Sequence, residues 1–195
     1  MSCKYEIIKN YKNKKYKLGE NMNLNEIKNS QDVYQFMEDN IEYGWIDING
    51  IKHLNTMKEF RKIYKTMSIK EILEYKIGTC IEQVNLMHYL LSKLNIQNKM
   101  YCCRIFEPDD YGNLEEEEHM HCFVLYFENG KVYHMEHPNF ENKGIFEYNS
   151  EDEAVKTIVD YYIKLRGGKD SPTKEFYEIP VGISFKEFNK YINHV

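Results

Sequence analysis

The sequence predicts a single domain of the α+β class over residues 1–195, with no repeat or linker to divide it. Two observations predict this class. Several segments begin with a helix-capping pattern and continue with apolar residues at spacings of three and four. Between these segments, alternating residues and one Asn-Gly dipeptide between residues 99 and 138 indicate an antiparallel hairpin and a further strand.

Composition and charge narrow the class of protein. The chain has 195 residues, a net charge of −5 and 14% aromatic residues, so it can fold around a sizeable core. An acidic chain lacks the basic face of a sequence-independent nucleic-acid binder, and no long apolar run predicts a membrane span. We therefore expect a cytoplasmic protein that binds neither nucleic acid nor membrane. Irregular spacing predicts reduced thiols for the five cysteines, Cys3, Cys80, Cys102, Cys103 and Cys122.

The N-terminal third is expected to be mainly helical. Residues 4–17 carry six lysines and are expected to form a solvated edge or a strand. Helical patterns follow Ser30 and span residues 57–67, and Asn49-Gly50 between them predicts a turn. The only tryptophan, Trp45, is typical of a core residue whose indole N–H finds a carbonyl, and a position lining a cleft is the other interpretation.

A short helix is predicted just before the central segment of the chain. Ser68 and Glu71 have the spacing of a capping box, and we expect Gly78 to end the helix that they begin.

The next helix begins at a position suited to a nucleophile. Thr79 and Glu82 predict a second capping box, which places Cys80 on the first turn of a helix that reaches about Leu94. Unpaired N–H groups and the positive end of the helix dipole favour a thiolate there. A buried structural cysteine is the alternative. Gln83, one turn further on, faces either the same cleft or the surface.

A strand and an acidic loop come next. Residues 99–107 alternate as a strand does, and the following residues, including Glu115–Glu118, are typical of a solvated loop. Attraction of basic substrates to a nearby cleft is the weaker interpretation of this acidic run.

The Asn129-Gly130 dipeptide predicts a tight hairpin. If the turn is correct, opposite residues have numbers that sum to 259, so Phe123 lies opposite Glu136. His121 shares the face of Phe123 because strand side chains alternate, and His121 and Glu136 are then diagonal neighbours. A carboxylate beside an imidazole fixes its orientation and stabilises the imidazolium. The two strands of the hairpin are predicted over residues 119–128 and 131–138.

A zinc site is an alternative use of the histidines on these strands. Neither a CxxC nor an HExxH spacing supports it, so we expect no metal and no other cofactor. The candidate ligands would be His119, His121, Cys122, His134 and His137.

The C-terminal part predicts two more capped helices around a short strand. Ser150 with Glu153 begins one helix, which should stop at Gly167-Gly168, and Ser184 with Glu187 begins the last. The strand is expected over residues 176–179.

Cys80, His121 and Glu136 together supply a nucleophile, a base and a group that orients the base. With these residues in that order, the sequence resembles the transglutaminase-like superfamily of the papain-like cysteine fold, and in particular a group of uncharacterised bacterial transglutaminase-like proteins. The resemblance covers about residues 43–148, with residues 150–195 as a C-terminal extension. It rests on Tyr43-Gly44-Trp45, Gly78-Thr79-Cys80, the segment Cys80–Gln83, His121-Cys122-Phe123 and Met135-Glu136-His137-Pro138.

The resemblance implies N-terminal helices and a nucleophile helix packed on an antiparallel sheet. It implies that Cys80 attacks a carbonyl to form a thioester, that His121 acts as base and then acid, and that Glu136 holds His121. The Cys80 N–H would supply part of the oxyanion hole, with Trp45 as a weaker second donor. Two departures are that the acid is usually Asp and that an aromatic residue usually stands where this chain has Ile81.

Two functions follow as expectations. The first is hydrolysis of an amide or peptide, or acyl transfer to an amine, with a peptide, a protein or a small amide or amine as substrate. The second is a degenerate module that binds a peptide or protein partner in the same cleft without turnover. Because this kind of fold hosts several acyl chemistries, the two stay open at the level of sequence.

Overall fold

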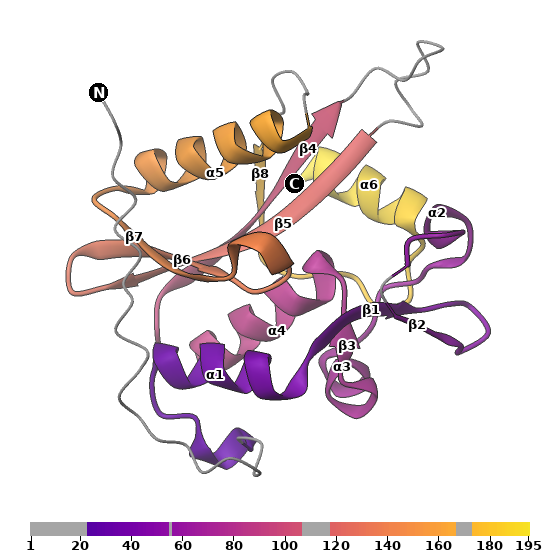
Figure 1. The fold of residues 1–195 in the computed structure, drawn as a ribbon, viewed down its shortest axis with the longest axis horizontal. Helices are drawn as coiled ribbons and strands as arrows, with labels where there is room; N and C mark the ends of the chain where they lie inside the picture. The colour runs from indigo at the N-terminus through magenta and orange to yellow at the C-terminus, as the bar shows by residue number, and fades with distance from the viewer. Residues whose placement is uncertain (1–22, 55, 107–117, 167–172) are drawn as a thin grey trace.

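The computed structural model describes residues 23–54, 56–106, 118–166 and 173–195. These residues form an α+β fold in which a five-stranded antiparallel sheet, in the order β7-β6-β5-β4-β8, lies between helices (Figure 1). Its strands are β4 (Asn98–Phe106), β5 (Glu118–Glu128), β6 (Lys131–Glu136), β7 (Gly144–Tyr148) and β8 (Thr173–Phe176). The Lys-rich residues 4–17 and most of the acidic run Glu115–Glu118 lie outside the described ranges.

A second, three-stranded sheet and six α-helices complete the described structure. The small sheet, in the order β2-β1-β3, consists of β1 (Glu42–Ile46), β2 (Lys52–Leu54) and β3 (Ile77–Gly78). The helices are α1 (Ser30–Asn40), α2 (Phe60–Ile63), α3 (Ile69–Tyr75), α4 (Cys80–Lys93), α5 (Glu151–Arg166) and α6 (Phe185–His194). Short 3-10 helices are found at Leu24–Glu26 and Phe140–Asn142. No helix in these described ranges is both long and apolar enough to cross a membrane.

The large sheet separates two hydrophobic cores. Helix α4 packs against β4 and β5 on one face, with α1 beside it, and α5 covers the other face (Figure 1). Successive side chains of β5 alternate between the two cores, since strand side chains point to opposite faces in turn. Val124 packs on the α4 side and Leu125 on the α5 side. This alternation fixes which side chains of β5 can reach the start of α4.

The predicted hairpin is confirmed with its register. Asn129 and Gly130 have φ values of 52° and 73°, which are the left-handed values of a two-residue turn that matches strand twist. Glu128 faces Lys131, and the ladder continues as predicted to Val124 and Met135. There β6 leaves β5, so no strand of the described ranges pairs with this side of β5 from Phe123 back toward the start of the strand.

The three capping boxes at Ser68, Thr79 and Ser184 are confirmed. The cap of α1 is Asn29 instead of Ser30, since the Asn29 side chain accepts from the Asp32 N–H. Helix α5 begins as predicted, and Gly167-Gly168 lies outside the described ranges.

Three predictions about element boundaries were wrong. Of residues 57–67 only α2 is helical, because Tyr64 and Lys65 instead form isolated bridges with Asp47 and Ser184. The last strand is β8 at Thr173–Phe176 and not residues 176–179. Helix α3 ends at Tyr75 and not at Gly78, because the capping residue Lys76 takes the left-handed conformation with φ 57°.

Gly78 serves close packing instead. It pairs with Tyr43 in the small sheet, and a Cβ placed on it would lie 2.7 Å from Cβ of Glu82 and 3.2 Å from Cγ of Gln83. The absence of a side chain therefore lets β3 run directly against the first turn of α4.

Replacing Gly78 with alanine is expected to lower the free energy of unfolding by about 1–3 kcal/mol, because the first turn of α4 must move. Urea denaturation followed by circular dichroism measures this. The matched control is Lys76→Gly. Glycine adopts the left-handed conformation of this position without strain, so the free energy of unfolding is expected to fall by less than about 1 kcal/mol. A smaller loss for Gly78→Ala than for Lys76→Gly would contradict the close-packing role of Gly78.

Candidate active site

Cys80 is the first residue of α4, and the residues around it fix the start of the helix. The Glu82 carboxylate accepts hydrogen bonds from the Thr79 N–H at 3.0 Å and from the Thr79 hydroxyl at 2.5 Å. Its other oxygen accepts from the Tyr64 hydroxyl at 2.5 Å. Burial raises the pKa of Glu82, which is 1% exposed. The capping box uses the amides of Thr79 and Glu82 and leaves those of Cys80 and Ile81 without a helical partner.

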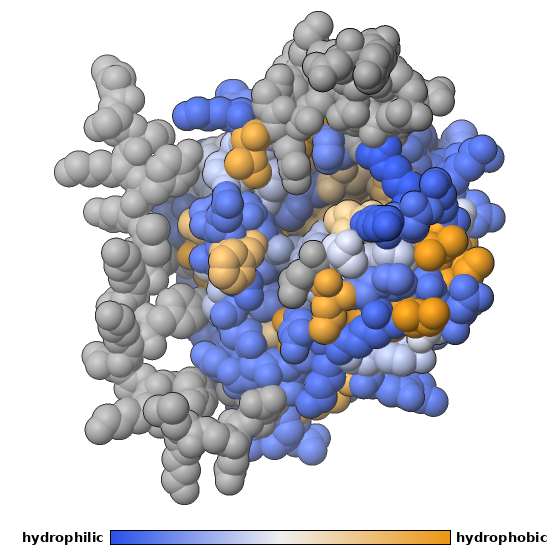
Figure 2. Space-filling model, turned by 45° about the vertical axis from the view of Figure 1, so that its right-hand side comes forward, coloured by the Kyte–Doolittle hydropathy of each residue, from blue (hydrophilic) through white to orange (hydrophobic). Residues whose placement is uncertain are grey.

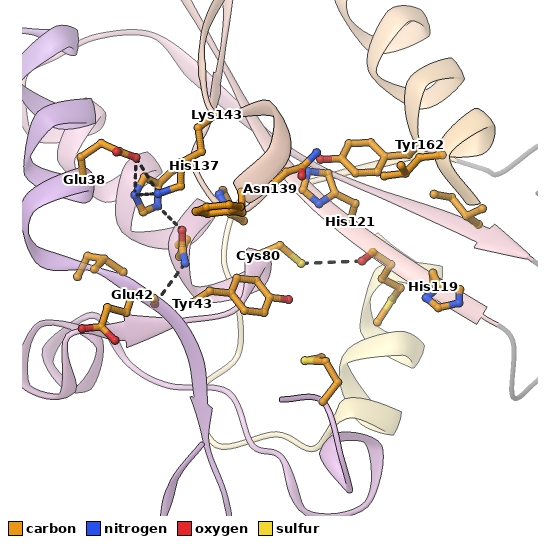
Figure 3. Close-up of a pocket in the computed structure, with 18 residues that line it drawn as sticks. Glu38, Glu42, Tyr43, Cys80, His119, His121, His137, Asn139, Lys143 and Tyr162 are labelled. Atoms are coloured by element: carbon orange, nitrogen blue, oxygen red, sulfur yellow. Dashed lines mark hydrogen bonds and ion pairs between the residues drawn. The ribbon is translucent and has the colours of Figure 1, made fainter. Parts of the chain in front are cut away.

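The sulfur of Cys80 lies against the open edge of β5. Its Sγ is 3.9 Å from the carbonyl oxygen of Met120 (Figure 3). The side chain and the backbone of Cys122 also hydrogen-bond with it. Met120 and Cys122 are two residues apart, so their backbone polar groups point to the same side of the strand. Cys80 thus occupies the position where β6 has separated from β5, immediately beside His121.

His121 contacts the carboxylate of Glu136 and the aromatic ring of Tyr162. Its Nε2 lies 2.8 Å from Oε2 of Glu136, which confirms the predicted diagonal contact. The imidazole stacks on the Tyr162 ring at a centroid separation of 3.9 Å. Glu136 also accepts from the Tyr162 hydroxyl at 3.1 Å and from the Asn139 N–H at 3.0 Å. With Nε2 engaged, Nδ1 is the nitrogen left to hydrogen-bond with Cys80.

The charges of this group reinforce one another. Burial by itself would lower the pKa of His121, but the charge of Glu136 and hydrogen bonds to Cys80 and Glu136 raise it from 6.5 to about 10. A hydrogen bond with Cys122, together with the hydrogen bond and charge of His121, holds the pKa of Cys80 well below its usual value despite burial. Burial by itself would raise the pKa of Glu136, but the charges and hydrogen bonds of His121 and His134 together lower it. These shifts all favour the charged form of each group: a thiolate on Cys80, an imidazolium on His121 and a carboxylate on Glu136.

A second buried histidine, His134, which the sequence offered only as a candidate zinc ligand, also approaches Glu136. His134 Nε2 lies 3.3 Å from Oε2 of Glu136, and it has no aligned hydrogen-bond partner among the described residues. His134 stands two residues before Glu136 on β6, so both side chains lie on the same face of the strand, as the sequence predicted. Within the described part of the chain, no three His, Cys, Asp or Glu side chains are arranged to hold a metal ion.

Gln83 lines the cavity beside Cys80, but its amide is already bonded. The amide N–H donates to the Gly78 carbonyl at 2.8 Å, and Oε1 lies 2.5 Å from Nδ1 of His137. Nε2 of His137 is 3.0 Å from Glu38, whose pKa is lowered to about 2 by hydrogen bonds with His137 and Lys143 despite burial. Gln83 therefore faces the cleft, as one of the two sequence interpretations had it, and its amide braces the start of α4.

Trp45 is a core residue, as one of the two sequence interpretations had it. It is fully buried, it stacks on His53 at 4.0 Å, and its indole N–H donates to the carbonyl of Thr56 at 2.7 Å. The N–H that the resemblance assigned to the oxyanion is thus already paired, and Trp45 lines neither cavity beside Cys80. The Trp45 indole N–H is therefore not available to an oxyanion.

Two cavities meet at Cys80. The larger has a volume of about 620 Å³ and the smaller about 430 Å³. Figure 3 shows the larger cavity, with the Cys80 sulfur and the His121 imidazole near one another and the Glu38–His137 pair further away. Both cavities are lined by Tyr43, Met57, Cys80, His119 and Met120.

Comparison with known proteins gives similarity to solved structures only. No family model and no curated protein matches the chain. Similar solved structures include an arylamine N-acetyltransferase from Bacillus cereus, described as having a Cys-His-Glu catalytic triad, at 15% identity and a TM-score of 0.34. Another is arylamine N-acetyltransferase C from Bacillus anthracis, at 14% identity and a TM-score of 0.32. Each match covers 60% of this chain and 42% of the other chain. The finer assignment to the transglutaminase-like superfamily stays a prediction.

Proposed function

We propose that this protein carries out cysteine-dependent acyl chemistry, with Cys80 as nucleophile, His121 as base and acid, and Glu136 as the group that orients His121. The observation that carries the proposal is the 2.8 Å bond from Nε2 of His121 to Glu136, which leaves Nδ1 to the sulfur. Such catalysis requires a nucleophile that is hydrogen-bonded to a base, and an acid that is hydrogen-bonded to the base and orients it.

The first half-reaction forms a thioester. The Cys80 thiolate attacks the carbonyl carbon, and the carbonyl π electrons move onto oxygen. The amides of Cys80 and Ile81 lie at the helix start where this negative charge develops. When the oxyanion collapses, the bond to the leaving group breaks and the His121 imidazolium gives its proton to that group. Acyl-enzyme and free amine or alcohol result.

The second half-reaction releases the acyl group. Neutral His121 takes a proton from water or from an incoming amine, which attacks the thioester carbon, and the C–S bond breaks to restore the thiolate. Water gives hydrolysis and an amine gives acyl transfer. We propose a peptide, a protein or a small amide or amine as substrate, in a reducing compartment such as the cytoplasm that keeps the thiol available.

The test is the alkylation of Cys80 by iodoacetamide, measured by peptide-level mass spectrometry so that the other cysteines do not contribute. At pH 6 the rate is expected to be about 10- to 100-fold above that of a small-molecule thiol, because the lowered pKa keeps Cys80 a thiolate. The rate should change again near pH 10, where His121 loses its proton.

The His121→Ala variant is expected to lose this advantage, since the pKa of Cys80 then rises. The matched control is His88→Ala, two turns further along α4, which should react as the wild type does. If Cys80 reacts no faster than the small thiol in both the wild type and His121→Ala, the nucleophile role fails. The module that binds a peptide or protein partner without turnover would then take its place.

A further inference from the structure

The cleft has two arms that differ in the catalytic groups they contain. We call the larger cavity the His121 arm and the smaller one the Phe185 arm, after residues that line each. Cys80 lines both arms, whereas His121 lines only the His121 arm. Thr79 and Ile81, at the start of α4 where the free amides lie, line only the second. The sulfur therefore stands between its proton donor on one side and the helix start on the other.

This arrangement fixes how a substrate can lie across Cys80. Proton transfer requires the leaving atom to come within hydrogen-bond reach of the imidazole, about 2.6–3.2 Å between heavy atoms. The leaving group, and later the incoming nucleophile, must therefore occupy the His121 arm. The tetrahedral carbon carries its acyl substituent in a different direction from the leaving group, and the remaining open direction is the Phe185 arm.

We propose that the Phe185 arm binds the acyl group and that the His121 arm binds the leaving or accepting amine. This assignment rests on the proposed function and adds the substrate class of each half of the site. The acyl group enters between α2 and α6, and the amine enters on the side of α5 and the residues that follow β6.

The lining of the Phe185 arm favours an apolar acyl group. Phe60 and Phe185 contact edge to face at 5.4 Å, and Ile81 and Met57 complete the apolar walls. The Arg61 guanidinium lies over the Phe185 ring at 5.4 Å. Burying an alkyl or aryl acyl chain on these rings removes apolar surface from water.

The His121 arm carries exposed apolar side chains at its mouth. Phe140 is 87% exposed and Leu165 is 45% exposed, and both line this arm. On the face seen in Figure 2, the described surface is mainly hydrophilic, with small separate groups of hydrophobic residues. An amine that carries an apolar group can cover Phe140 and Leu165 when its nitrogen reaches His121.

The acyl half is tested with p-nitrophenyl esters from acetate to octanoate, which share one leaving group and differ only in acyl length. Phe185→Ala enlarges the arm and is expected to shift the preferred acyl chain to greater length. Phe185→Trp narrows it and should shift the preference toward acetate. The ratio of acylation rates between long and short esters should change about 10-fold or more in opposite directions, as pocket-filling differences of a methylene or more do. The opposite shifts separate a specificity role from a loss of folding.

The amine half is tested by the partition of the acyl-enzyme between water and butylamine. Phe140→Ala is expected to raise the butylamine concentration for half-maximal transfer about 3- to 10-fold, with the acyl-length preference unchanged. The control is Tyr177→Ala, which removes an exposed aromatic side chain that lines neither arm. The Phe185 variants should leave the butylamine dependence unchanged.

The outcomes separate the two proposals. If Cys80 is acylated but Phe140→Ala changes acyl-length preference while the Phe185 variants change butylamine dependence, the arms are assigned the wrong way round. If Cys80 is acylated and neither set of variants changes either property, the division into two arms is refuted. If no ester acylates Cys80 in the wild type, the proposed function itself fails, and the assignment fails with it.

Discussion

Replacing Glu136 with glutamine is expected to lower kcat/KM for cleavage of a reactive aryl ester about 10³- to 10⁴-fold, the scale of effect seen when a triad acid becomes an amide. Glutamine keeps the size of the side chain but removes the charge that holds the His121 pKa at about 10. Burial, which opposes that charge, then lowers the pKa of His121, and the imidazolium is lost at neutral pH. The thiolate loses its counter-ion with it.

The change has a pH signature that a structural defect would not give. In the wild type the ion pair persists from the low pKa of Cys80 up to about pH 10. In Glu136→Gln the rate of Cys80 alkylation at pH 6 should fall, because the sulfur is then protonated there. Glu147→Gln, which removes a carboxylate from β7 of the same sheet, is the control and should keep wild-type rates. Retention of more than a tenth of kcat/KM by Glu136→Gln would show that Glu136 does not orient His121.

Replacing Trp45 with alanine is expected to lower the free energy of unfolding by about 3–5 kcal/mol, the usual cost of removing a large buried aromatic side chain. Trp45 is fully buried, stacks on His53 and contacts Phe60 edge to face at 5.4 Å. Its loss leaves a cavity under the small sheet and the Thr56 carbonyl without its 2.7 Å partner.

Urea denaturation of the Trp45 variants must be followed by circular dichroism, because the chain contains no other tryptophan. Trp45→Phe keeps a ring and loses the N–H, so a smaller loss of about 1–2 kcal/mol is expected. Ile51→Ala, at a side chain that is 57% exposed in the turn between β1 and β2, should change stability by less than about 0.5 kcal/mol. Equal stability of Trp45→Ala and the wild type would contradict the core role.

The central geometry of the candidate site could be predicted from local rules. A two-residue turn fixes strand register, and the alternation of strand side chains then places His121 near Glu136. A capping box fixes the first turn of a helix within four residues, which places Cys80 at N1. Each rule acts over a few residues, so no knowledge of the rest of the fold is needed.

Other residues of the site depend on elements far apart in the sequence. Tyr162 reaches His121 from α5, and Glu38 reaches His137 from α1. Neither has a spacing motif, so sequence reasoning gave no signal for them. The same reason accounts for Trp45 and Gln83, whose N–H groups are paired by the carbonyls of Thr56 and Gly78. Which buried donor finds which acceptor is decided only when the chain packs.

By itself, the sequence determined the α+β class, the starts of helices α3 to α6, the hairpin register and the pairing of His121 with Glu136. Tertiary structure decided that β6 leaves β5 at Val124 and Met135, which opens the strand edge where the Cys80 sulfur lies. It also decided that Gly78 is needed for close packing and that two cavities meet at Cys80. The physical reason is range: hydrogen-bond periodicity and capping act between near neighbours along the chain, whereas cavities and close approaches arise from the sum of contacts between distant segments.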